Sequence, residues 1–491
     1  MIKSVTPKRM REIEEHAINN IGIPGLVLME HAAIGLVRAY QQAFGDKQAL
    51  VICGPGNNGG DGLAFARLYA AKGGSVRVVL LCEDVALSGD AQMNLHLAYN
   101  MGVTIEHALP NSFENGVIVD AIFGTGLSRA PQGVYEKAIE WINAQGVQVL
   151  AVDIPSGVNA QNGLTEGCAV RAAQTVTFGY PKIGHYLFPG RELSGEITLC
   201  DIGLGNHIPP DGPVILQECD VQGLIAPRQR NTHKGTYGHA LILAGSRGMA
   251  GAASLCALGA LRAGAGLVSC GLCETSVMPI LQVRNPEAVA YPLLEEDGAL
   301  AEQDITHLFT GKAAIAIGPG MRNTPATAAL AEQVLASGIS CVLDADALNA
   351  YAGRYLRAHG NVVLTPHPGE MARLIGEVVT KPLAQAAAVA KKTGAVVLLK
   401  GATTVIAAAD GRTALNIYGT SGMATGGSGD VLSGVIASLM AQGLQAFDAA
   451  CAGAYLHAKA GEEAAKSAGI APMTALDIAN GLKDAFLAIG R

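Results

Sequence analysis

Short apolar runs alternate with longer, helix-like segments along most of the chain. In the first half the apolar runs are ALVICG, VRVVLLC, VIVDAIFG and VQVLAVD, and stretches such as LAFARLYAAKG separate them. This alternation is typical of a mostly parallel sheet with helices on both faces. The pattern therefore predicts an α/β fold that begins near Ala49.

The same pattern starts again in the second half, after a Pro- and Gly-rich stretch at residues 208–213. Its apolar runs are HALILAGS, AAIAIGPG, CVLDADALN, NVVLTPHPGE and AVVLLKGATTVIAA, followed by a Gly-rich turn and a long apolar helix. Such a composition shift marks a domain boundary. We find no internal repeat between the halves, and we expect two different α/β domains, at residues 1–212 and 216–491.

Composition agrees with two globular domains. The 491 residues exceed one ordinary core, since domains average about 150 residues, and 49% are hydrophobic against 15% charged. The net charge of −7 and the lack of a Lys/Arg run argue against a nucleic-acid partner. No uncharged apolar run reaches the roughly 18 residues of a membrane span, and the N-terminus lacks an apolar leader segment. We expect a soluble, cytoplasmic protein, and the large apolar fraction suggests a homo-oligomer.

Two local patterns are assigned to structure rather than chemistry. Thr6 followed by Pro7 predicts the start of a helix, with Thr6 as its N-cap. Cys270 and Cys273 form a C-x-x-C pair, but GLVSCGLC reads as a strand, whereas a redox pair is expected at a helix N-terminus. The scattered cysteines are therefore expected to be reduced thiols.

The stretch GPGNNGGDG follows the first apolar run. Its glycines satisfy G-x-G-x-x-G, the loop that seats a dinucleotide on a helix N-terminus. Glu83 or Asp84 could then bind the ribose, so a Rossmann dehydrogenase is one alternative. The asparagines and the aspartate within this loop favour a different use, because amide and carboxylate oxygens coordinate hard cations.

Three aspartates lie where strands end or helices begin. Asp61 follows the glycine loop, Asp120 ends GVIVD, and Asp153 ends QVLAVD. Because ligands of open parallel sheets bind beyond the carboxyl ends of the strands, we expect these carboxylates to converge. The alternative for each of them is a helix cap or a turn.

GPGNNGGDG, DAIFGTGLSR and DIPSGV, in this order and spacing, resemble the N-terminal domain of the NAD(P)H-hydrate epimerases, the YjeF N-terminal family. The resemblance implies a Rossmann-like three-layer domain that interconverts the two epimers of hydrated NADH or NADPH. It also implies a K+ ion held by Asn58, Asp120 and Ser156. It places the substrate on Asn57, Asn58, Gly59, Gly60, Asp61, Gly124, Thr125, Gly126, Leu127, Ser128, Arg129, Ala130, Tyr135 and Asp153.

The epimerisation needs a positioned acid/base, because a ring hydroxyl leaves as water and water returns on the other face. Asp153 is the candidate. An unperturbed Asp titrates near a pKa of about 3.9, so burial or the negative charge of Asp120 would have to raise its pKa.

In the second half, MATGGSGDVLSGVIASLMAQG carries the strongest pattern. Gly426, Gly427, Ser428 and Gly429 precede an apolar helix, whose N-terminal amides can bind an anion. Asp430 then stands where a base could take the proton of a hydroxyl that attacks a phosphoryl group. The alternative for Asp430 is helix capping.

Two further loops suit a nucleotide site. KGATT offers an ammonium, hydroxyls and backbone amides to phosphates, although its glycine spacing is not that of a P-loop. PHPGEM places His367 between prolines, where a turn role and a functional role are equally open.

GMAGAASL, GPGM, PHPGEM, KGATT and GGSGD together resemble the ADP- or ATP-dependent NAD(P)H-hydrate dehydratases, a branch of the ribokinase-like fold. The resemblance implies phosphorylation of the hydrate hydroxyl with Mg2+ and ADP, and elimination of phosphate to restore NADH or NADPH. It places the substrate on Ala252, Gly320, His367 and Asp430, and the nucleotide on Lys400, Gly401, Ala402, Thr403, Thr404 and Gly429. Fusion to the epimerase resembles the bacterial form, which uses ADP, although the motifs do not separate ADP from ATP.

The two halves predict one bifunctional repair enzyme, in which the first supplies the epimer that the second dehydrates. The main alternative is an ATP-dependent kinase of a vitamin-like small molecule whose N-terminal domain only binds.

Overall fold

The computed structural model describes residues 2–127, 129–354 and 356–491. The chain forms two compact units. One comprises Lys3–Pro213, and the other comprises Val214–Arg491 together with Ile2. Each unit has its own sheet, so the two are described separately.

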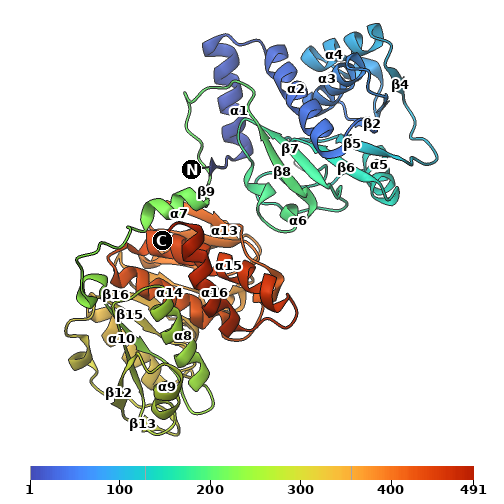
Figure 1. The fold of residues 1–491 in the computed structure, drawn as a ribbon. Helices are drawn as coiled ribbons and strands as arrows, with labels where there is room; N and C mark the ends of the chain where they lie inside the picture. The colour runs from blue at the N-terminus through green and yellow to red at the C-terminus, as the bar shows by residue number, and fades with distance from the viewer. Residues whose placement is uncertain (1, 128, 355) are drawn as a thin grey trace. The chain divides into compact units, whose positions relative to one another are not determined.

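A seven-stranded sheet forms the centre of the first unit (Figure 1). Its order is β4-β3-β2-β5-β6-β7-β8, and every neighbouring pair is parallel. The strands are β2 (Gln48–Cys53), β3 (Val76–Leu80), β4 (Thr104–Glu106), β5 (Gly116–Ala121), β6 (Gln148–Val152), β7 (Gln174–Phe178) and β8 (Glu196–Cys200). The chain runs outward from β2 to β4 and returns to β5 on the other side of β2. The strand order therefore reverses between β2 and β5, where ligands of doubly wound folds bind.

Helices cover both faces of this sheet, which confirms the three layers. They are α1 (Pro7–His16), the π-helix η1 (Ala17–Ile21), α2 (Gly25–Phe44), α3 (Asn57–Ala71), η2 (Asp84–Ala86), α4 (Gly89–Asn100), α5 (Val134–Ala144), η3 (Ile183–His185) and α6 (Gly190–Ser194). Successive β2 side chains point to opposite faces. Val51 packs with the apolar residues of α2, α3 and α4, whereas Leu50 and Ile52 pack with those of α5.

Helix α1 begins where the sequence predicts. The Thr6 side chain accepts a hydrogen bond from Arg9 N at 3.1 Å, and Pro7 occupies the first helical position. Met10 and Ile13 form the buried face of the helix. Their neighbour Glu14 is thereby brought to the edge of the sheet, where it lines a cavity.

An eleven-stranded sheet forms the centre of the second unit, in the order β1-β9-β20-β19-β18-β17-β16-β15-β10-β11-β12. Its strands are β1 (Ile2–Lys3), β9 (Val214–Ile215), β10 (His239–Leu243), β11 (Leu267–Cys273), β12 (Val289–Leu293), β15 (Ala314–Ile317), β16 (Ser340–Leu343), β17 (Val362–Leu364), β18 (Val396–Leu399), β19 (Thr404–Ala407) and β20 (Thr413–Asn416). The strands from β12 to β18 pair in parallel, and the order reverses between β10 and β15. β13 (Glu295–Glu296) and β14 (Ala299–Leu300) form a separate hairpin.

The run AVVLLKGATTVIAA is a hairpin, and its turn lies in the predicted KGATT loop. β18 and β19 pair antiparallel, with Leu399 opposite Val405. The turn between them carries residues 400–403, so the KGATT loop lies at the carboxyl end of β18.

The longest helices of the second unit include α14, whose side chains are nearly all buried. The helices are α7 (Glu218–Leu224), η4 (Lys234–Tyr237), α8 (Ala250–Arg262), α9 (Met278–Arg284), η5 (Thr306–Phe309), α10 (Pro325–Ala336), α11 (Ala345–Asn349), α12 (Pro368–Ile375), α13 (Pro382–Thr393), η6 (Ser421–Met423), α14 (Ser428–Ala441), α15 (Ala446–Ala468) and α16 (Ala475–Ala488). Figure 1 shows α8, α14, α15 and α16 grouped together. α8 and α14 approach closely, because a Cβ on Gly434 would lie 1.9 Å from the Cys256 carbonyl oxygen.

All ten cysteines are free thiols, and Cys270 and Cys273 are buried in β11, as the sequence predicts for a strand. Within the described part of the chain, every helix is too short or too polar to cross a membrane.

Candidate active sites

A cavity of about 650 Å³ opens at the strand-order reversal of the first unit. The ends of β2 and β5 contribute Pro55–Asn58 and Ile122–Leu127 to its wall, while α1 contributes Arg11, Glu14 and Glu15. Asp61, Asp90, Asp153 and Lys182 complete the polar lining. Glu83 and Asp84 are not among its lining residues, so the placement expected for a Rossmann dehydrogenase is not observed.

Two glycines of GPGNNGGDG pack rather than line the cavity. α3 begins at Asn57, so this part of the stretch is the first turn of a helix. A Cβ on Gly59 would lie 2.0 Å from the Gly54 carbonyl oxygen, and one on Gly60 would lie 2.8 Å from the Met29 side chain. Gly59 therefore allows α3 to start against the β2 loop, and Gly60 allows α3 to pack against α2 and α4. Their placement on the substrate stays a prediction.

The other predicted substrate residues divide into two groups. Asn57, Asn58, Asp61, Gly124, Thr125, Gly126, Leu127 and Asp153 line the cavity, whereas Arg129, Ala130 and Tyr135 do not. Tyr135 instead packs against Phe123, with ring centroids 5.0 Å apart, and Phe123 lines the cavity. Ser128 lies outside the described residues.

Asp120 is fully buried and does not reach the cavity, so the expected convergence holds only for Asp61 and Asp153. Ser156 donates to its carboxylate through its Oγ at 2.6 Å and its backbone N at 2.8 Å, and Ile122 N donates at 3.2 Å. Burial raises the pKa of Asp120 to about 6, although these hydrogen bonds lower it. Nearby, the Asn58 side chain faces Gly124, and its Nδ2 has no hydrogen-bond partner.

Asp153 is held as a carboxylate, so the raised pKa that an acid role would require is not found. Burial alone would raise the pKa, but the Lys182 ammonium lies 2.5 Å from its Oδ1 and holds the pKa below the usual range. Thr177 Oγ1 also donates to Oδ1, at 2.9 Å. The backbone of Asp153 adopts φ of 64°, a left-handed conformation that aspartate tolerates better than most residues.

Asp61 has the opposite environment. Burial, followed by the charges of Asp153 and Glu14, raises the pKa of Asp61 well above the usual range, while Lys182 acts in the other direction. Burial also raises the pKa of Glu14. Glu14 and Lys182 were not predicted as site residues. The only local signal for Lys182 is a lysine four residues after the end of a buried strand, in FGYPKIGH.

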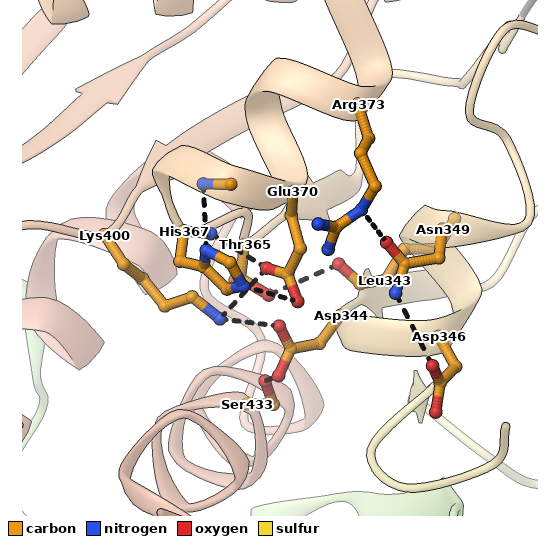
Figure 2. A network of polar contacts seen from close by, with 11 residues as sticks. Leu343, Asp344, Asp346, Asn349, Thr365, His367, Glu370, Arg373, Lys400 and Ser433 are labelled. Atoms are coloured by element: carbon orange, nitrogen blue, oxygen red, sulfur yellow. Dashed lines mark hydrogen bonds and ion pairs between the residues drawn. The ribbon is translucent and has the colours of Figure 1, made fainter. Parts of the chain in front are cut away.

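In the second unit, a polar network lies at the carboxyl ends of β16, β17 and β18 (Figure 2). The Lys400 ammonium is 2.8 Å from Asp344 Oδ1 and 3.7 Å from Glu370 Oε2. Ser433 Oγ, from α14, donates to Asp344 Oδ2 at 2.8 Å. Burial lowers the pKa of Lys400, but Asp344 and Glu370 outweigh it and raise the pKa.

The carboxyl group of Asp430 belongs to the same acidic surroundings. Burial raises the pKa of Asp430 to about 7, and Asp344, Asp346 and Glu370 add to the shift while Lys400 opposes it. A carboxylate with a pKa near neutrality can accept a proton from a hydroxyl and later release it.

The glycine turn before α14 brings this base to the lysine. A Cβ on Gly429 would lie 3.2 Å from Lys400 Nζ, so the ammonium stands beside the N-terminal turn of the helix. Gly427 has φ of 91°, a conformation that glycine adopts readily. The arrangement combines helix amides and an ammonium, both of which attract phosphate.

His367 is the N-cap of α12. Its Nδ1 accepts a hydrogen bond from Gly369 N at 3.0 Å, and its backbone N donates to Glu370 Oε2 at 2.8 Å. The side chain is half exposed. The turn role left open by the sequence is therefore observed, and the ring edge is accessible to a ligand.

The remaining predicted residues lie at neighbouring strand ends. Lys400 N donates to Pro366 O at 2.8 Å, which links the KGATT loop to PHPGEM, and residues 401–404 continue from there. Gly320 follows β15 with φ of 62°, and a Cβ there would lie 2.9 Å from Ala252 Cβ on α8. Asp344, Glu370 and Ser433 were not predicted, although Asp344 directly follows the apolar run in CVLDADALN.

The folds and sites define an α/β enzyme class with two ligand sites, one at the strand-order reversal of the first unit and one at the carboxyl ends of β16, β17 and β18 in the second. The model of the family described as "NAD(P)H-hydrate dehydratase" matches residues 240–483, and the "YjeF-related protein N-terminus" matches residues 25–184. A dehydratase of Bacillus subtilis described as ADP/ATP-dependent, co-crystallised with ATP/Mg2+, is 34% identical with a TM-score of 0.51, covering 56% of this chain and 99% of that one. A ribokinase-like superfamily protein of Enterococcus faecalis is 25% identical, with a TM-score of 0.51, over 58% of this chain and 99% of the other.

Two curated relatives extend over almost the whole chain. The bifunctional NAD(P)H-hydrate repair enzyme of Moorella thermoacetica is 40% identical, over 96% of this chain and 94% of the relative. That of Escherichia coli is 35% identical, over 96% and 91%. The chain belongs to the family of bifunctional NAD(P)H-hydrate repair enzymes. The family membership does not favour the vitamin-kinase alternative.

Proposed function

We propose that the first unit interconverts the R and S epimers of hydrated NADH and NADPH, and that the second unit dehydrates the S epimer. The second reaction would use ADP and give AMP, phosphate and NADH or NADPH. The observation that carries this proposal is the similarity of the whole chain to bifunctional repair enzymes. The cavity of the first unit and the polar network after β16–β18 of the second supply a separate place for each reaction.

In the second unit, Asp430 would take the proton of the hydrate hydroxyl as that oxygen attacks the terminal phosphoryl group of the nucleotide. Its pKa of about 7 suits this role. Lys400–Thr404 and Gly429 would hold the nucleotide, and Ala252, Gly320 and His367 would hold the hydrate. Elimination of the phosphate ester then restores the nicotinamide ring.

The carboxylates around Lys400 fit a Mg2+ ion that is shared with the nucleotide. Mg2+ is usually held by one or two carboxylates together with phosphates. Asp344 and Glu370 both direct an oxygen toward the Lys400 ammonium, so cations are already attracted to this point. No group of three or more His, Cys, Asp or Glu ligands is present among the described residues, which agrees with a metal completed by phosphates. When bound, Mg2+ would neutralise charge on the phosphates.

For the first unit we propose K+ as a bound cation, held by Asn58, Asp120 and Ser156. The residues fit it, because Asp120 is fully buried with hydrogen bonds from Ser156 and Ile122 only, and carries no ion pair among the described residues. A buried carboxylate without a cation is costly. The unpartnered Asn58 Nδ2 also indicates a side-chain amide whose surroundings are incomplete. K+ bound there would supply positive charge next to the cavity, which Asn58 also lines.

We further propose that the protein acts in the cytoplasm, on small molecules and as a homo-oligomer, without nucleic-acid or membrane partners. The free state of all ten cysteines supports a reducing compartment. The homo-oligomer rests on the large apolar fraction alone.

The experiment that tests the function follows the absorbance of restored dihydronicotinamide. Purified protein is mixed with both epimers of hydrated NADH, Mg2+, K+ and either ADP or ATP. Recovery beyond the amount of the S epimer supports both activities and identifies the phosphoryl donor. Recovery that stops at the S epimer would contradict the epimerase. Nucleotide consumption without recovery would contradict the dehydratase and support the vitamin kinase.

A further inference from the structure

Four charged side chains meet at one wall of the first unit's cavity. They are Glu14 from α1, Asp61 from α3, Asp153 after β6 and Lys182 after β7. The other charged residues of the lining are Arg11, Glu15 and Asp90. Asp61 and Asp153 are both carboxylic acids, but the structure surrounds them in opposite ways.

The Lys182 ammonium forms an ion pair with Asp153. Lys182 is 1% exposed, and its Nζ donates to Asp153 Oδ1 at 2.5 Å, Thr177 Oγ1 at 3.0 Å and the Phe178 carbonyl at 3.2 Å. An ammonium has three protons, so its hydrogen-bonding capacity is filled. Both Lys182 and Thr177 bind Oδ1, and Oδ2 accepts no hydrogen bond from the described residues. Asp153 therefore stays ionised and keeps one oxygen available to the cavity.

His185 fixes the backbone of Asp153 without adding charge. Its Nδ1 accepts from Lys182 N at 3.1 Å, so its Nε2 carries the proton and donates to the Asp153 carbonyl at 2.8 Å. Burial, together with Lys182, lowers the pKa of His185 to about 4. The ring is neutral at neutral pH, and Lys182 is the cation that acts on Asp153.

Asp61 lacks any such partner. Its carboxyl group makes no hydrogen bond or ion pair with the described residues, yet it lines the cavity beside Asp153 and Glu14. An unpaired carboxyl in a partly buried, negatively charged setting favours its protonated form. Two carboxyl groups whose environments separate their protonation states form an acid/base pair.

We infer that Asp61 is the general acid and Asp153 the general base of the epimerisation, and that Lys182 is a positioning residue that keeps Asp153 ionised. This assignment rests on the proposed epimerase function. Asp61 gives its proton to the ring hydroxyl, the C–O bond breaks with its electron pair leaving on water, and the ring nitrogen lone pair forms a C=N bond. A second cavity water then attacks the carbon on the other face, and its proton passes through cavity water to Asp153 Oδ2. Cavity water returns that proton from Asp153 to Asp61.

The test uses the full chain without nucleotide, so that the second unit is idle. One epimer of hydrated NADH is supplied in water enriched in oxygen-18. Both epimers are then separated, and the oxygen-18 content of each is measured by mass spectrometry. Wild type is expected to form the other epimer with the heavy oxygen in its hydroxyl. Asp61→Asn is expected to slow this by about 10²–10⁴-fold, the contribution of a general acid. The exposed Asp46→Asn is the matched control and should retain the wild-type rate.

The pH profile tests Lys182. The rate should fall at low pH as Asp153 gains a proton and at high pH as Asp61 loses its proton. Lys182→Met removes a positive charge that lowers the pKa of both Asp153 and Asp61. Both limbs of the pH–rate profile, the fall at low pH and the fall at high pH, should therefore move to higher pH. Lys182→Arg retains the charge and should keep the limbs near the wild-type positions. A purely structural role would lower the rate without moving the limbs.

Recovery of NADH from the S epimer with ADP shows for each variant whether the second unit works, and a melting curve shows whether the first unit is folded. A folded Asp61→Asn protein with the wild-type rate would overturn the assignment of the acid. Unmoved limbs in Lys182→Met would overturn the positioning role. A wild-type chain that forms no second epimer would overturn the proposed function itself, and this inference with it.

Discussion

Asp430 combines two properties that work against each other. The group needs a pKa near neutrality to act as a base, and burial beside Asp344 and Asp346 supplies it. The same surroundings make the ionised form unfavourable in the folded protein. A base of this kind is therefore expected to reduce stability at the pH at which it functions.

Asp430→Asn is expected to lower the dehydratase rate by about 10²–10⁴-fold and to stabilise the protein at high pH. Because the pKa of about 7 lies above the reference 3.8, protonation favours folding at acid pH, and this contribution is lost as the pH rises through about 7. The gain from Asn should therefore grow in melting curves as the pH rises from 3.8 to about 7 and be full above neutrality, at roughly 2–4 °C per kcal/mol, and it should vanish below the reference pKa. Wild-type activity should rise with pH up to about 7.

The control is Asp410→Asn in the turn between β19 and β20. Asp410 has a lowered pKa because Arg412 donates to it through its backbone and side chain, so this substitution should not stabilise the protein at high pH. Dehydratase activity should be retained. A stabilisation of the same size in Asp410→Asn would contradict the prediction for Asp430.

The sequence predicts those site residues that strand ends and glycine turns position. Asp61, Asp153 and Asp430 were identified because parallel strands end, and the helices after them begin, at one edge of a sheet. Lys182, Glu14 and Asp344 were not, because their roles depend on which side chains fold against them. The direction of the Asp153 pKa shift follows from Lys182, 29 positions further along the chain, and local pattern does not reveal that contact.

At the scale of elements, α14 connects the glycine turn at its N-terminus to the central sheet of the second unit. Ser433 on this helix donates to Asp344, which ends β16, and Asp344 accepts from Lys400, which ends β18. These hydrogen bonds hold the N-terminal part of α14 close to the carboxyl ends of β16 and β18. The network is drawn in Figure 2.

Ser433→Ala is expected to raise the KM for the nucleotide roughly tenfold, the effect of one hydrogen bond to a charged group. Loss of the Ser433 donor leaves Asp344 free to move with Lys400. Initial rates at varied ADP would measure the change. Ser438→Ala is the matched control, because Ser438 is also buried in α14 but bonds to Gln442. Equal effects of the two substitutions would indicate a general loss of helix packing instead.

Element boundaries show where pattern reading falls short. KGATT was predicted as a loop, but the pattern does not show that the four residues 400–403 turn the chain back so that β18 pairs with β19 antiparallel. GPGNNGGDG reads as a loop, yet α3 starts at its first asparagine. In both cases tertiary packing, rather than local propensity, sets the limit of the element.

At the scale of the whole molecule, each unit has its own sheet and its own site. We expect calorimetry to show two unfolding transitions. K+ should raise one of them and ADP with Mg2+ the other, because a ligand stabilises the unit that binds it by about 2.7 kcal/mol at a concentration of 100 Kd. Asp120→Asn should abolish the K+ shift.

Na+ at equal ionic strength is the control for this measurement. A shift with Na+ equal to that with K+ would indicate a general salt effect and contradict the K+ site. A single transition that both ligands raise equally would contradict independent unfolding of the two units.

The packing of α3 against β2 affects how the sequences of related chains can be used to infer whether they are active. A Cβ on Gly59 would lie 2.0 Å from the Gly54 carbonyl oxygen, and one on Gly60 would lie 2.8 Å from the Met29 side chain and 3.0 Å from Ala91 Cα. The packing therefore favours glycine at both positions whether or not the cavity carries out chemistry. A paralogue that has lost catalysis and serves only as a scaffold would still inherit these glycines. The presence of the glycine-rich stretch in a related chain therefore indicates common ancestry and fold. Replacement of Asp61 or Lys182 would instead indicate that the chain has lost epimerase activity.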